Sequence, residues 1–327
     1  MKVKENWLKK GFVDEPIENN IDLKIAIKNL CKEKNAIIMA HYYQNKDVQE
    51  IADYIGDSLA LAQWAKNTDA DIIVVCGVNF MGETAKILSP EKTVLIPDLN
   101  AGCSLADSCK AEDLLKLKNQ FPNHKVISYV NTTAEVKALT DICVTSTNAK
   151  KIISQLPKNE KIIFGPDKNL GGYINKTVGV DMKLWDGACH VHEQFQLSEI
   201  LEMKKKYPNA KILTHPECKD EIIAISDVVG STQALINYSV ENDYNEFIVV
   251  TESGVIHEMK RLNPTKIFIP IQIQEDGIKK CNECKYMRLN TLEKIYNCLK
   301  YNYPIIEIEE EIRKKAEKSI IEMLKLS

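Results

Sequence analysis

The amino-acid sequence predicts an α/β protein made of three similar three-layer αβα domains, with parallel sheets, around a pseudo-threefold axis. Short apolar segments rich in β-branched residues alternate with longer amphipathic segments typical of helices. Polar strand ends recur at a nearly constant interval along the chain, and three cysteines recur with them. Strands that alternate with helices favour βαβ units, in which functional side chains lie at the carboxyl ends of the strands.

Length and charge exclude several classes of function. The chain has 327 residues, 44% of them hydrophobic, which is enough to form the cores of several domains. Its net charge of −3, without a basic stripe, argues against nucleic acid or an anionic membrane as a partner. The longest apolar runs are strand-sized, far below the roughly 20 residues that span a bilayer. The first twenty residues are mixed and charged, so we expect a cytoplasmic protein.

The hydrophobic pattern assigns strands and helices along most of the chain. We expect strands at 36–40, 71–76, 93–96, 125–130, 161–164, 211–214, 223–229, 246–251 and 266–269. We expect helices at 47–65, 82–88, 148–155, 195–206 and 232–238.

Three of these strands end in similar polar sequences, at 41–43, 129–131 and 215–217. Their starts lie 88 and 86 residues apart. Each is followed by a second polar turn that precedes a helix and offers N-capping side chains and free backbone N–H groups. We expect these second turns at 77–79, 145–148 and 230–233.

The ten cysteines do not form a disulfide framework in a reducing cytosol, and three of them follow the same period. Cys103 and Cys189 are 86 residues apart, and Cys189 and Cys284 are 95 apart. A period shared by strand ends, turns and cysteines predicts internal triplication. Closure around a threefold axis would bring one thiolate from each unit to the centre. The predicted units are 1–105 together with 275–327, then 106–190 and 191–274.

Three thiolates favour an iron–sulfur cluster, zinc or copper(I). Structural zinc sites are usually closed by four ligands, and Cys281 and Cys284 form the one CxxC of the chain. A zinc-stabilised or thiol-redox module that uses these two cysteines is therefore one alternative. Another is a non-catalytic cluster protein, an electron carrier or iron sensor, which would usually supply four thiolates.

Motifs from about residue 36 to residue 295 resemble, in order, those of the quinolinate synthase family. They are MAHYYQ at 39–44, GDS at 56–58, CGVNFMGETAK at 76–86, PDLNAGCSLA at 97–106, YVN at 129–131, GPDKNLG at 165–171, CHVHE at 189–193, HPEC at 215–218, GST at 230–232 and CKYMRLN at 284–290. Each motif is weak alone, and the ordered set is specific.

The resemblance implies an enzyme, a transferase of NAD biosynthesis that condenses iminoaspartate with dihydroxyacetone phosphate to give quinolinate, phosphate and water. It implies one [4Fe-4S] cluster per chain, held by Cys103, Cys189 and Cys284, with an open iron as Lewis acid. Some relatives have CxxCxxC at the last site. Here the first of those positions is Ile278, and Cys281 remains the alternative to Cys284. An aspartate oxidase or aspartate dehydrogenase is the expected supplier of iminoaspartate.

The same resemblance assigns roles to polar strand ends. It implies proton transfer by Tyr43 and Glu217, assisted by His41, His192 and His215. Residues expected to hold the carboxylate and phosphate groups of the substrates are His41, Ser58, Tyr129, Asn131, Ser146, His215, Glu217, Ser231 and Thr232.

Overall fold

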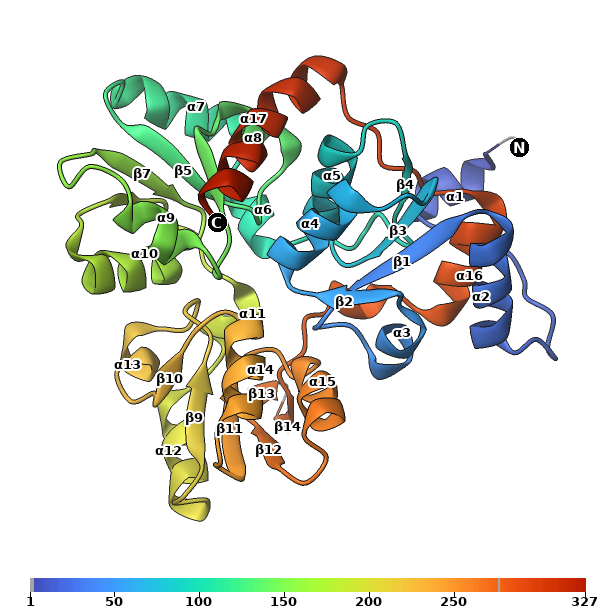
Figure 1. Ribbon diagram of the computed structural model, residues 1–327. Coiled ribbons are helices and arrows are strands. Elements are labelled where there is room, and N and C mark those ends of the chain that lie inside the picture. Colours follow the sequence, from blue (N-terminus) through green and yellow to red (C-terminus); the bar gives the residue numbers. More distant parts are fainter. Residues whose placement is uncertain (1–2, 276) are drawn as a thin grey trace.

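The structure, a computed structural model, describes residues 3–275 and 277–327. It contains three parallel four-stranded sheets, each flanked by helices, and the three units surround a common centre (Figure 1). The units follow one another along the chain, in blue to cyan, green, and yellow to orange. The predicted α/β class and its threefold repetition are therefore confirmed.

The strand order is the same in all three sheets, with the first strand of each unit between the second and the third. The orders are β2-β1-β3-β4, β6-β5-β7-β8 and β10-β9-β11-β12. In the first unit the strands are β1 Ala36–His41, β2 Tyr54–Gly56, β3 Ile72–Cys76 and β4 Thr93–Leu95, with helices α3 Lys46–Ile51, α4 Ser58–Asn67 and α5 Asn79–Leu88.

The second and third units repeat this arrangement. The second has β5 Lys125–Tyr129, β6 Ile142–Val144, β7 Ile162–Gly165 and β8 Lys183–Leu184, with α7 Ala111–Gln120, α8 Ala134–Leu139, α9 Ala149–Ser154 and α10 Lys168–Ile174. The third has β9 Lys211–Thr214, β10 Val228–Val229, β11 Glu246–Val250 and β12 Ile267–Pro270, with α12 Leu197–Lys206, α13 Asp220–Ile223, α14 Thr232–Glu241 and α15 Val255–Leu262.

The inner strands are mostly apolar because helices cover both faces of each sheet. All five residues of β3 are buried, a pattern typical of parallel sheets. An aspartate just before the second strand of each unit also ties that strand to the first. Its carboxylate accepts a hydrogen bond from a backbone N–H of the first strand, 15 residues earlier in the chain. The pairs are Asp53 with Ile38, Asp141 with Val126 and Asp227 with Ile212, at 2.7, 2.7 and 2.8 Å.

Two predicted elements are wrong. The segment 47–65 is not one helix but α3, the short strand β2 and α4, and the segment 223–229 contains only the strand β10 after the end of α13. An edge strand of two or three residues is too short to show the alternation of apolar and polar residues by which strands are recognised in a sequence. The second polar turn of the first unit is therefore 56–58, after β2, and not 77–79, which follows β3. The other eight predicted strands agree with observed ones to within one residue at each end.

A hairpin that the sequence analysis missed lies between the third sheet and Cys284. It pairs β13 Gln272–Glu275 with β14 Ile278–Cys281 in antiparallel fashion. This insertion lengthens the connection that leads to the last of the three cysteines. It explains why the interval from Cys189 to Cys284 is 95 residues and not 86.

The terminal helices pack around the first unit, and the last one also contacts the second. Helix α2 (Leu23–Glu33) packs against α16 (Leu292–Tyr301) beside the first sheet, with α1 (Glu5–Lys10) nearby. Helix α17 (Glu310–Leu326), red in Figure 1, contacts α5 of the first unit and α8 and α9 of the second. The proposed unit boundaries (1–105 with 275–327, 106–190 and 191–274) stay a prediction. In the part of the chain that the structure describes, no helix combines the length and apolarity needed to cross a membrane.

Candidate active site

A cavity lies where the carboxyl ends of the three sheets converge. It receives residues from β1, β5 and β9 and from the loops that follow them. All the predicted site residues except Ser231 line it: His41, Tyr43, Ser58, Cys103, Tyr129, Asn131, Ser146, Cys189, His192, His215, Glu217, Thr232 and Cys284. The fold thus brings together side chains that are up to 243 residues apart in the sequence.

Ser231 is absent from this lining because its hydroxyl caps α14, where it accepts a hydrogen bond from the Ala234 N–H at 3.3 Å. Its neighbour Thr232 lines the cavity instead. Each unit contributes one such residue to the cavity lining, 17 positions after the first residue of its polar strand end. These equivalent residues are Ser58, Ser146 and Thr232.

Two histidines are held in the same tautomer by the same backbone contact. The Nδ1 atom of His41 accepts the N–H of Tyr43 at 3.1 Å, and Nδ1 of His215 accepts the N–H of Glu217 at 3.3 Å. An imidazole that accepts at Nδ1 carries its proton on Nε2, and Nε2 of His215 lies 3.3 Å from Oγ of Ser146. Each ring is therefore a neutral hydrogen-bond donor at its far nitrogen.

Burial keeps both rings neutral. It lowers the pKa of His41 to about 3, with a further contribution from His215, and it lowers the pKa of His215 to about 3 as well, against the pull of Glu217. Desolvation disfavours the charged form of an imidazole. At neutral pH these rings donate hydrogen bonds without adding positive charge.

Tyr43 is held by two threonine hydroxyls. Its phenolic oxygen lies 2.8 Å from Oγ1 of Thr232 and 2.8 Å from Oγ1 of Thr251. Burial and the negative charge of Glu217 raise the pKa of Tyr43 well above its ordinary value. A phenol in this state is a proton donor and not a base.

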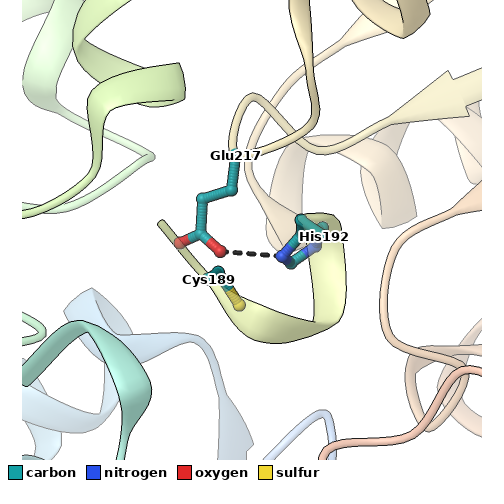
Figure 2. Close-up of side chains that lie close together, drawn as sticks. All are labelled: Cys189, His192 and Glu217. Atoms are coloured by element: carbon teal, nitrogen blue, oxygen red, sulfur yellow. Dashed lines mark ion pairs between the residues drawn. The ribbon is translucent and has the colours of Figure 1, made fainter. Parts of the chain in front are cut away.

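Glu217 is paired with His192, whose Nδ1 lies 2.8 Å from Oε2 of the carboxylate (Figure 2). Burial opposes ionisation, but the rings of His215 and His192 together hold the pKa of Glu217 below its ordinary value. The ligand atoms of Cys189, His192 and Glu217 all lie within 4.8 Å of one another. An acid–base pair thus lies directly beside one of the three sulfurs.

The three cysteines share a local geometry in which backbone N–H groups approach the sulfur atom. Cys103 and Cys189 are N-cap residues of the short helices α6 (Ser104–Ser108) and α11 (His190–Glu193), and Cys284 precedes the 3₁₀ turn Met287–Leu289. Burial raises the pKa of all three thiols, and backbone N–H groups two or three residues later lower each pKa in part. Those donors are on Leu105 and Ala106 for Cys103, on His192 for Cys189, and on Tyr286 and Met287 for Cys284.

Cys281, the alternative to Cys284, lies outside this cavity. It lines a separate hollow with Lys285 and Glu283, at the end of the hairpin. The location of Cys284 in the central cavity therefore favours it as the third ligand. Three sulfurs that line one cavity, each with N–H donors beside it, are a donor set that fits a soft metal centre with one open position.

The sequence analysis missed several residues at the site. Thr251 directly follows the strand β11, and Ser104 is the first residue of α6, directly after Cys103. The sequence analysis named neither as a site residue. The Oγ of Ser104 lies 3.1 Å from Nδ1 of His190, so these two residues connect the loops of Cys103 and Cys189. Their separation of 86 residues equals that of Cys103 and Cys189, so the contact follows the repeat.

A buried ion pair connects the third cysteine with Tyr43. Oε1 of Glu252, which is 0% exposed, accepts the Cys284 N–H at 3.1 Å and an Nη2 hydrogen of Arg288 at 2.7 Å. Arg288 also donates through Nη1 to the carbonyl oxygen of Tyr43. This network holds the Cys284 loop and the Tyr43 backbone in one arrangement.

Comparisons with known proteins agree with this architecture. Residues 25–325 match the family described as "Quinolinate synthetase A protein". A quinolinate synthase of Microcystis aeruginosa is 54% identical, with 94% of this chain and 95% of that protein covered. Those of Thermosynechococcus vestitus and Chloroherpeton thalassium are 53% and 52% identical, over 94% and 96% of this chain and 96% and 97% of their own lengths. The chain therefore belongs to the quinolinate synthetase A family of enzymes.

Proposed function

We propose that this enzyme condenses iminoaspartate with dihydroxyacetone phosphate to form quinolinate, phosphate and water, as a step of NAD biosynthesis in the cytoplasm. The observation that supports this most is the convergence of three cysteines and the polar strand ends of three units on one cavity. The printed names of relatives similar over nearly their whole length point to the same product. An aspartate oxidase or aspartate dehydrogenase is the proposed supplier of iminoaspartate.

We propose Cys103, Cys189 and Cys284 as the ligands of one [4Fe-4S] cluster. The fit rests on three sulfurs in one cavity, each beside backbone N–H donors that favour a thiolate. Bound there, the cluster would supply an iron with an open coordination position, able to act as a Lewis acid on a substrate oxygen.

The other cavity residues would bind and orient the substrates. His41 and His215 offer neutral Nε2–H donors, which suit carboxylates without neutralising the site. Ser58 and Thr232 lie at the first residues of the ten-residue helices α4 and α14, where free N–H groups and the helix dipole favour anions. Tyr129, Asn131 and Ser146 complete the proposed binding set on the second unit, and Ser231 supports it from the cap of α14.

Proton transfer is assigned to Tyr43 and Glu217. Glu217, a carboxylate held by His192, can remove a proton from a substrate atom. Tyr43, a phenol of raised pKa, can donate one to a departing oxygen. Dehydration needs both events, and Glu217 is buried away from bulk water.

The test is anaerobic purification, reconstitution with iron and sulfide, and an assay of quinolinate with both substrates supplied. A brown protein that forms quinolinate agrees with the proposal. A brown protein without this activity would indicate an electron carrier or iron sensor. A colourless protein that retains stoichiometric zinc would indicate a zinc module built on Cys281 and Cys284.

A further inference from the structure

The first turn of α10, in the second unit, contacts two segments of the candidate active site from outside the cavity. Asp167 is the N-cap of this helix and Asn169 lies within it, and neither side chain lines the central cavity. We propose that these two are positioning residues that clamp the short helix α11 against the loop of Glu217. Helix α11 follows Cys189 and contains His192. This inference rests on the proposed function and deepens it, because the clamp sets the separation between the base and one of the three sulfurs.

Asp167 holds the start of α11 through the backbone of Cys189. Its carboxylate accepts the N–H of Leu170 at 2.6 Å and the N–H of Cys189 at 3.3 Å, one on each oxygen. One residue further on, the N–H of Lys168 donates to the carbonyl oxygen of Gly187 at 2.8 Å. Asp167 is 0% exposed, so bulk water does not compete for these contacts. The start of α10 therefore fixes the chain immediately before α11.

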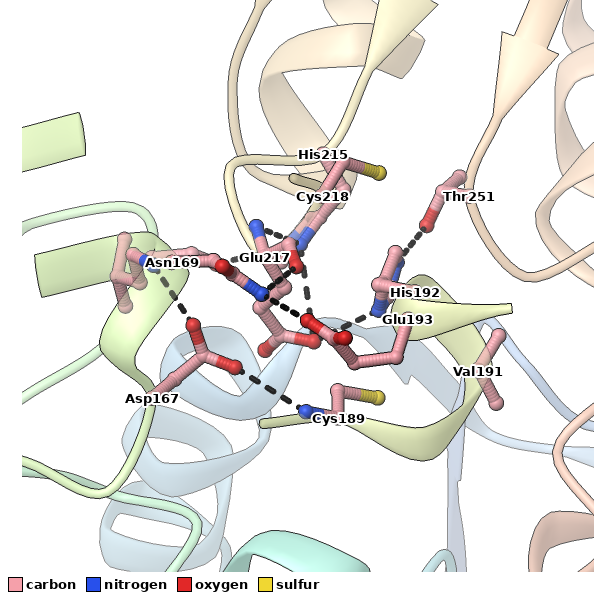
Figure 3. Close-up of polar contacts among 12 residues, drawn as sticks. Asp167, Asn169, Cys189, Val191, His192, Glu193, His215, Glu217, Cys218 and Thr251 are labelled. Carbon is pink, nitrogen blue, oxygen red and sulfur yellow. Dashed lines mark hydrogen bonds and ion pairs between the residues drawn. The ribbon is translucent and has the colours of Figure 1, made fainter. Parts of the chain in front are cut away.

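Asn169 holds the other end of α11 and the loop of Glu217 at the same time. Its amide nitrogen Nδ2 lies 2.7 Å from Oε1 of Glu193, the last residue of α11, and 3.0 Å from the carbonyl oxygen of Glu217. Both partners are acceptors, and an amide NH₂ group has two hydrogens to donate, one for each. Figure 3 shows both arms of the clamp, from Asp167 to Cys189 and from Asn169 to Glu193 and Glu217. One side chain thus bridges α11 and the third-unit loop that follows β9.

Helix α11 needs such external contacts because it is very short. It has four residues, far fewer than the roughly 12 that a helix needs to persist without packing. His192 lies between its two clamped ends, and Nδ1 of His192 is 2.8 Å from Oε2 of Glu217. The ligand atoms of both residues lie within 4.8 Å of the Cys189 sulfur. A rotation of α11 would change all of these distances together.

The backbone of Glu217 is held on both sides. Its N–H donates to Nδ1 of His215 at 3.3 Å, and its carbonyl oxygen accepts from Asn169 at 3.0 Å. With both peptide groups bound, the backbone at Glu217 keeps one orientation, and its carboxylate leaves the loop toward Cys189. Asn169 is therefore placed to control the direction of the base without touching the cavity.

The same arrangement recurs at Tyr43, which occupies the equivalent position in the first unit. Glu252, also 0% exposed, accepts the N–H of Cys284 at 3.1 Å, and its partner Arg288 donates to the carbonyl oxygen of Tyr43. In both cases a buried carboxylate accepts the N–H of a proposed ligand cysteine, and an adjacent side chain donates to the carbonyl of a proposed acid–base residue. Because two different pairs of side chains make the same two contacts, the recurrence supports a positioning role.

The kinetic experiment compares two substitutions of Asn169 that both remove the donor. Asn169→Asp keeps the shape of the side chain but turns a carboxylate oxygen toward Glu193 and the Glu217 carbonyl, whereas Asn169→Leu removes the polar group. On reconstituted enzyme we expect Asn169→Leu to lower kcat at least ~10-fold, with KM and iron content unchanged, because a small displacement of a reacting group is costly. Asn169→Asp should lower kcat at least as far. If Asn169 only filled space, Asn169→Asp would retain the wild-type kcat, and that result would refute the clamp.

Two controls lie in or directly after the same helix. Lys168→Ala lies between the two clamp residues and removes an exposed ion pair with Asp186. Asn175→Leu removes an amide that contacts the backbone of Met182 at the other end of α10. Both variants should stay within about twofold of the wild-type kcat, since an exposed ion pair or a contact remote from the cavity contributes little to the site.

Amide hydrogen exchange of the metal-free protein tests the clamp without the cluster or the reaction. Asp167→Asn replaces one acceptor oxygen by a donor group, and Asn169→Leu removes the contact at the other end. Each should raise the exchange rate of the segment 187–193 at least ~5-fold, because protection reflects the local free energy of opening and each variant loses a hydrogen bond there. Lys168→Ala should leave this rate unchanged. Unchanged exchange at 187–193 in both clamp variants would refute the clamp even if kcat fell.

The outcomes separate the clamp from the proposed function. A brown wild-type protein that forms no quinolinate would refute the proposed function, whereas faster exchange at 187–193 in both clamp variants would still support the clamp. Quinolinate formation by the wild type, with an undiminished kcat in Asn169→Leu and Asn169→Asp, would refute the clamp and leave the proposed function standing.

Discussion

Tyr43 and Glu217 occupy equivalent positions in two different units. Each lies two residues after a histidine whose Nδ1 accepts its backbone N–H, at 3.1 Å for His41 and 3.3 Å for His215. In the second unit the same position holds Asn131, two residues after Tyr129. One repeated turn therefore presents a phenol, an amide and a carboxylate to the same cavity, and the triplicated scaffold carries different chemistry in each copy.

We predict that Tyr43→Phe and Glu217→Gln each retain the brown cluster but lose at least ~100-fold in quinolinate synthesis, the usual cost of a missing acid–base group. Iron content, melting temperature and turnover should be measured on the same samples. If the residues only braced the strand ends, cluster and stability would fall together. Near-normal turnover with an intact cluster would move the role to His41, His192 or His215.

The cysteine ligands can be tested by substitution. Cys103→Ala, Cys189→Ala and Cys284→Ala should each abolish stable cluster binding after anaerobic reconstitution, because each removes one sulfur from the central cavity. Cys76→Ala and Cys298→Ala are controls, since both thiols are buried in apolar cores away from it. Cys281→Ala should keep the cluster. Full iron and sulfide in Cys284→Ala, with loss in Cys281→Ala, would reverse the choice within this pair.

The buried neutral histidines predict an acid-sensitive fold. The pKa of His41 and of His215 is about 3 in the folded protein, against about 6.5 for an exposed imidazole. Between these values the unfolded chain binds more protons, so stability falls as pH drops from about 6.5 toward 3. Each ring contributes a slope of about 1.4 kcal/mol per pH unit within this window.

Urea unfolding of the metal-free protein at several pH values checks this slope, because cluster loss then does not contribute. The variant His215→Gln should show a smaller dependence on pH between 6 and about 4.5, even where it is less stable overall. An identical slope in wild type and variant would mean that His215 is not held neutral by burial.

Ser231 and Thr232 are neighbours with different expected roles. Ser231→Ala removes the cap of α14 and should cost about 1 kcal/mol of stability with little effect on KM. Thr232→Val removes a cavity hydroxyl beside Tyr43 and should raise KM or lower kcat at nearly unchanged stability. Thermal unfolding and steady-state kinetics on both variants distinguish the roles. A larger kinetic effect from Ser231→Ala would return Ser231 to the binding set.

The sequence by itself determined the class of fold and its triplication. Apolar runs such as 72–76 and 247–250 identify inner strands, because a strand covered on both faces is mostly apolar. The interval of 86 residues between Cys103 and Cys189 reflects one complete unit. Polar strand ends at 41–43 and 215–217 were recognisable because they interrupt apolar segments.

Only the tertiary structure decided which residues meet and in which state. Short edge strands such as β2 owe their pairing to a neighbouring strand, so their own residues carried little signal. The choice of Cys284 over Cys281 depends on a hairpin that turns one cysteine away from the cavity. Thr251 contacts Tyr43 only because β11 ends beside Tyr43 of another unit. The protonation of His215 and Tyr43 likewise follows from burial and neighbouring charge, which are properties of the folded assembly of side chains and not of their order in the chain.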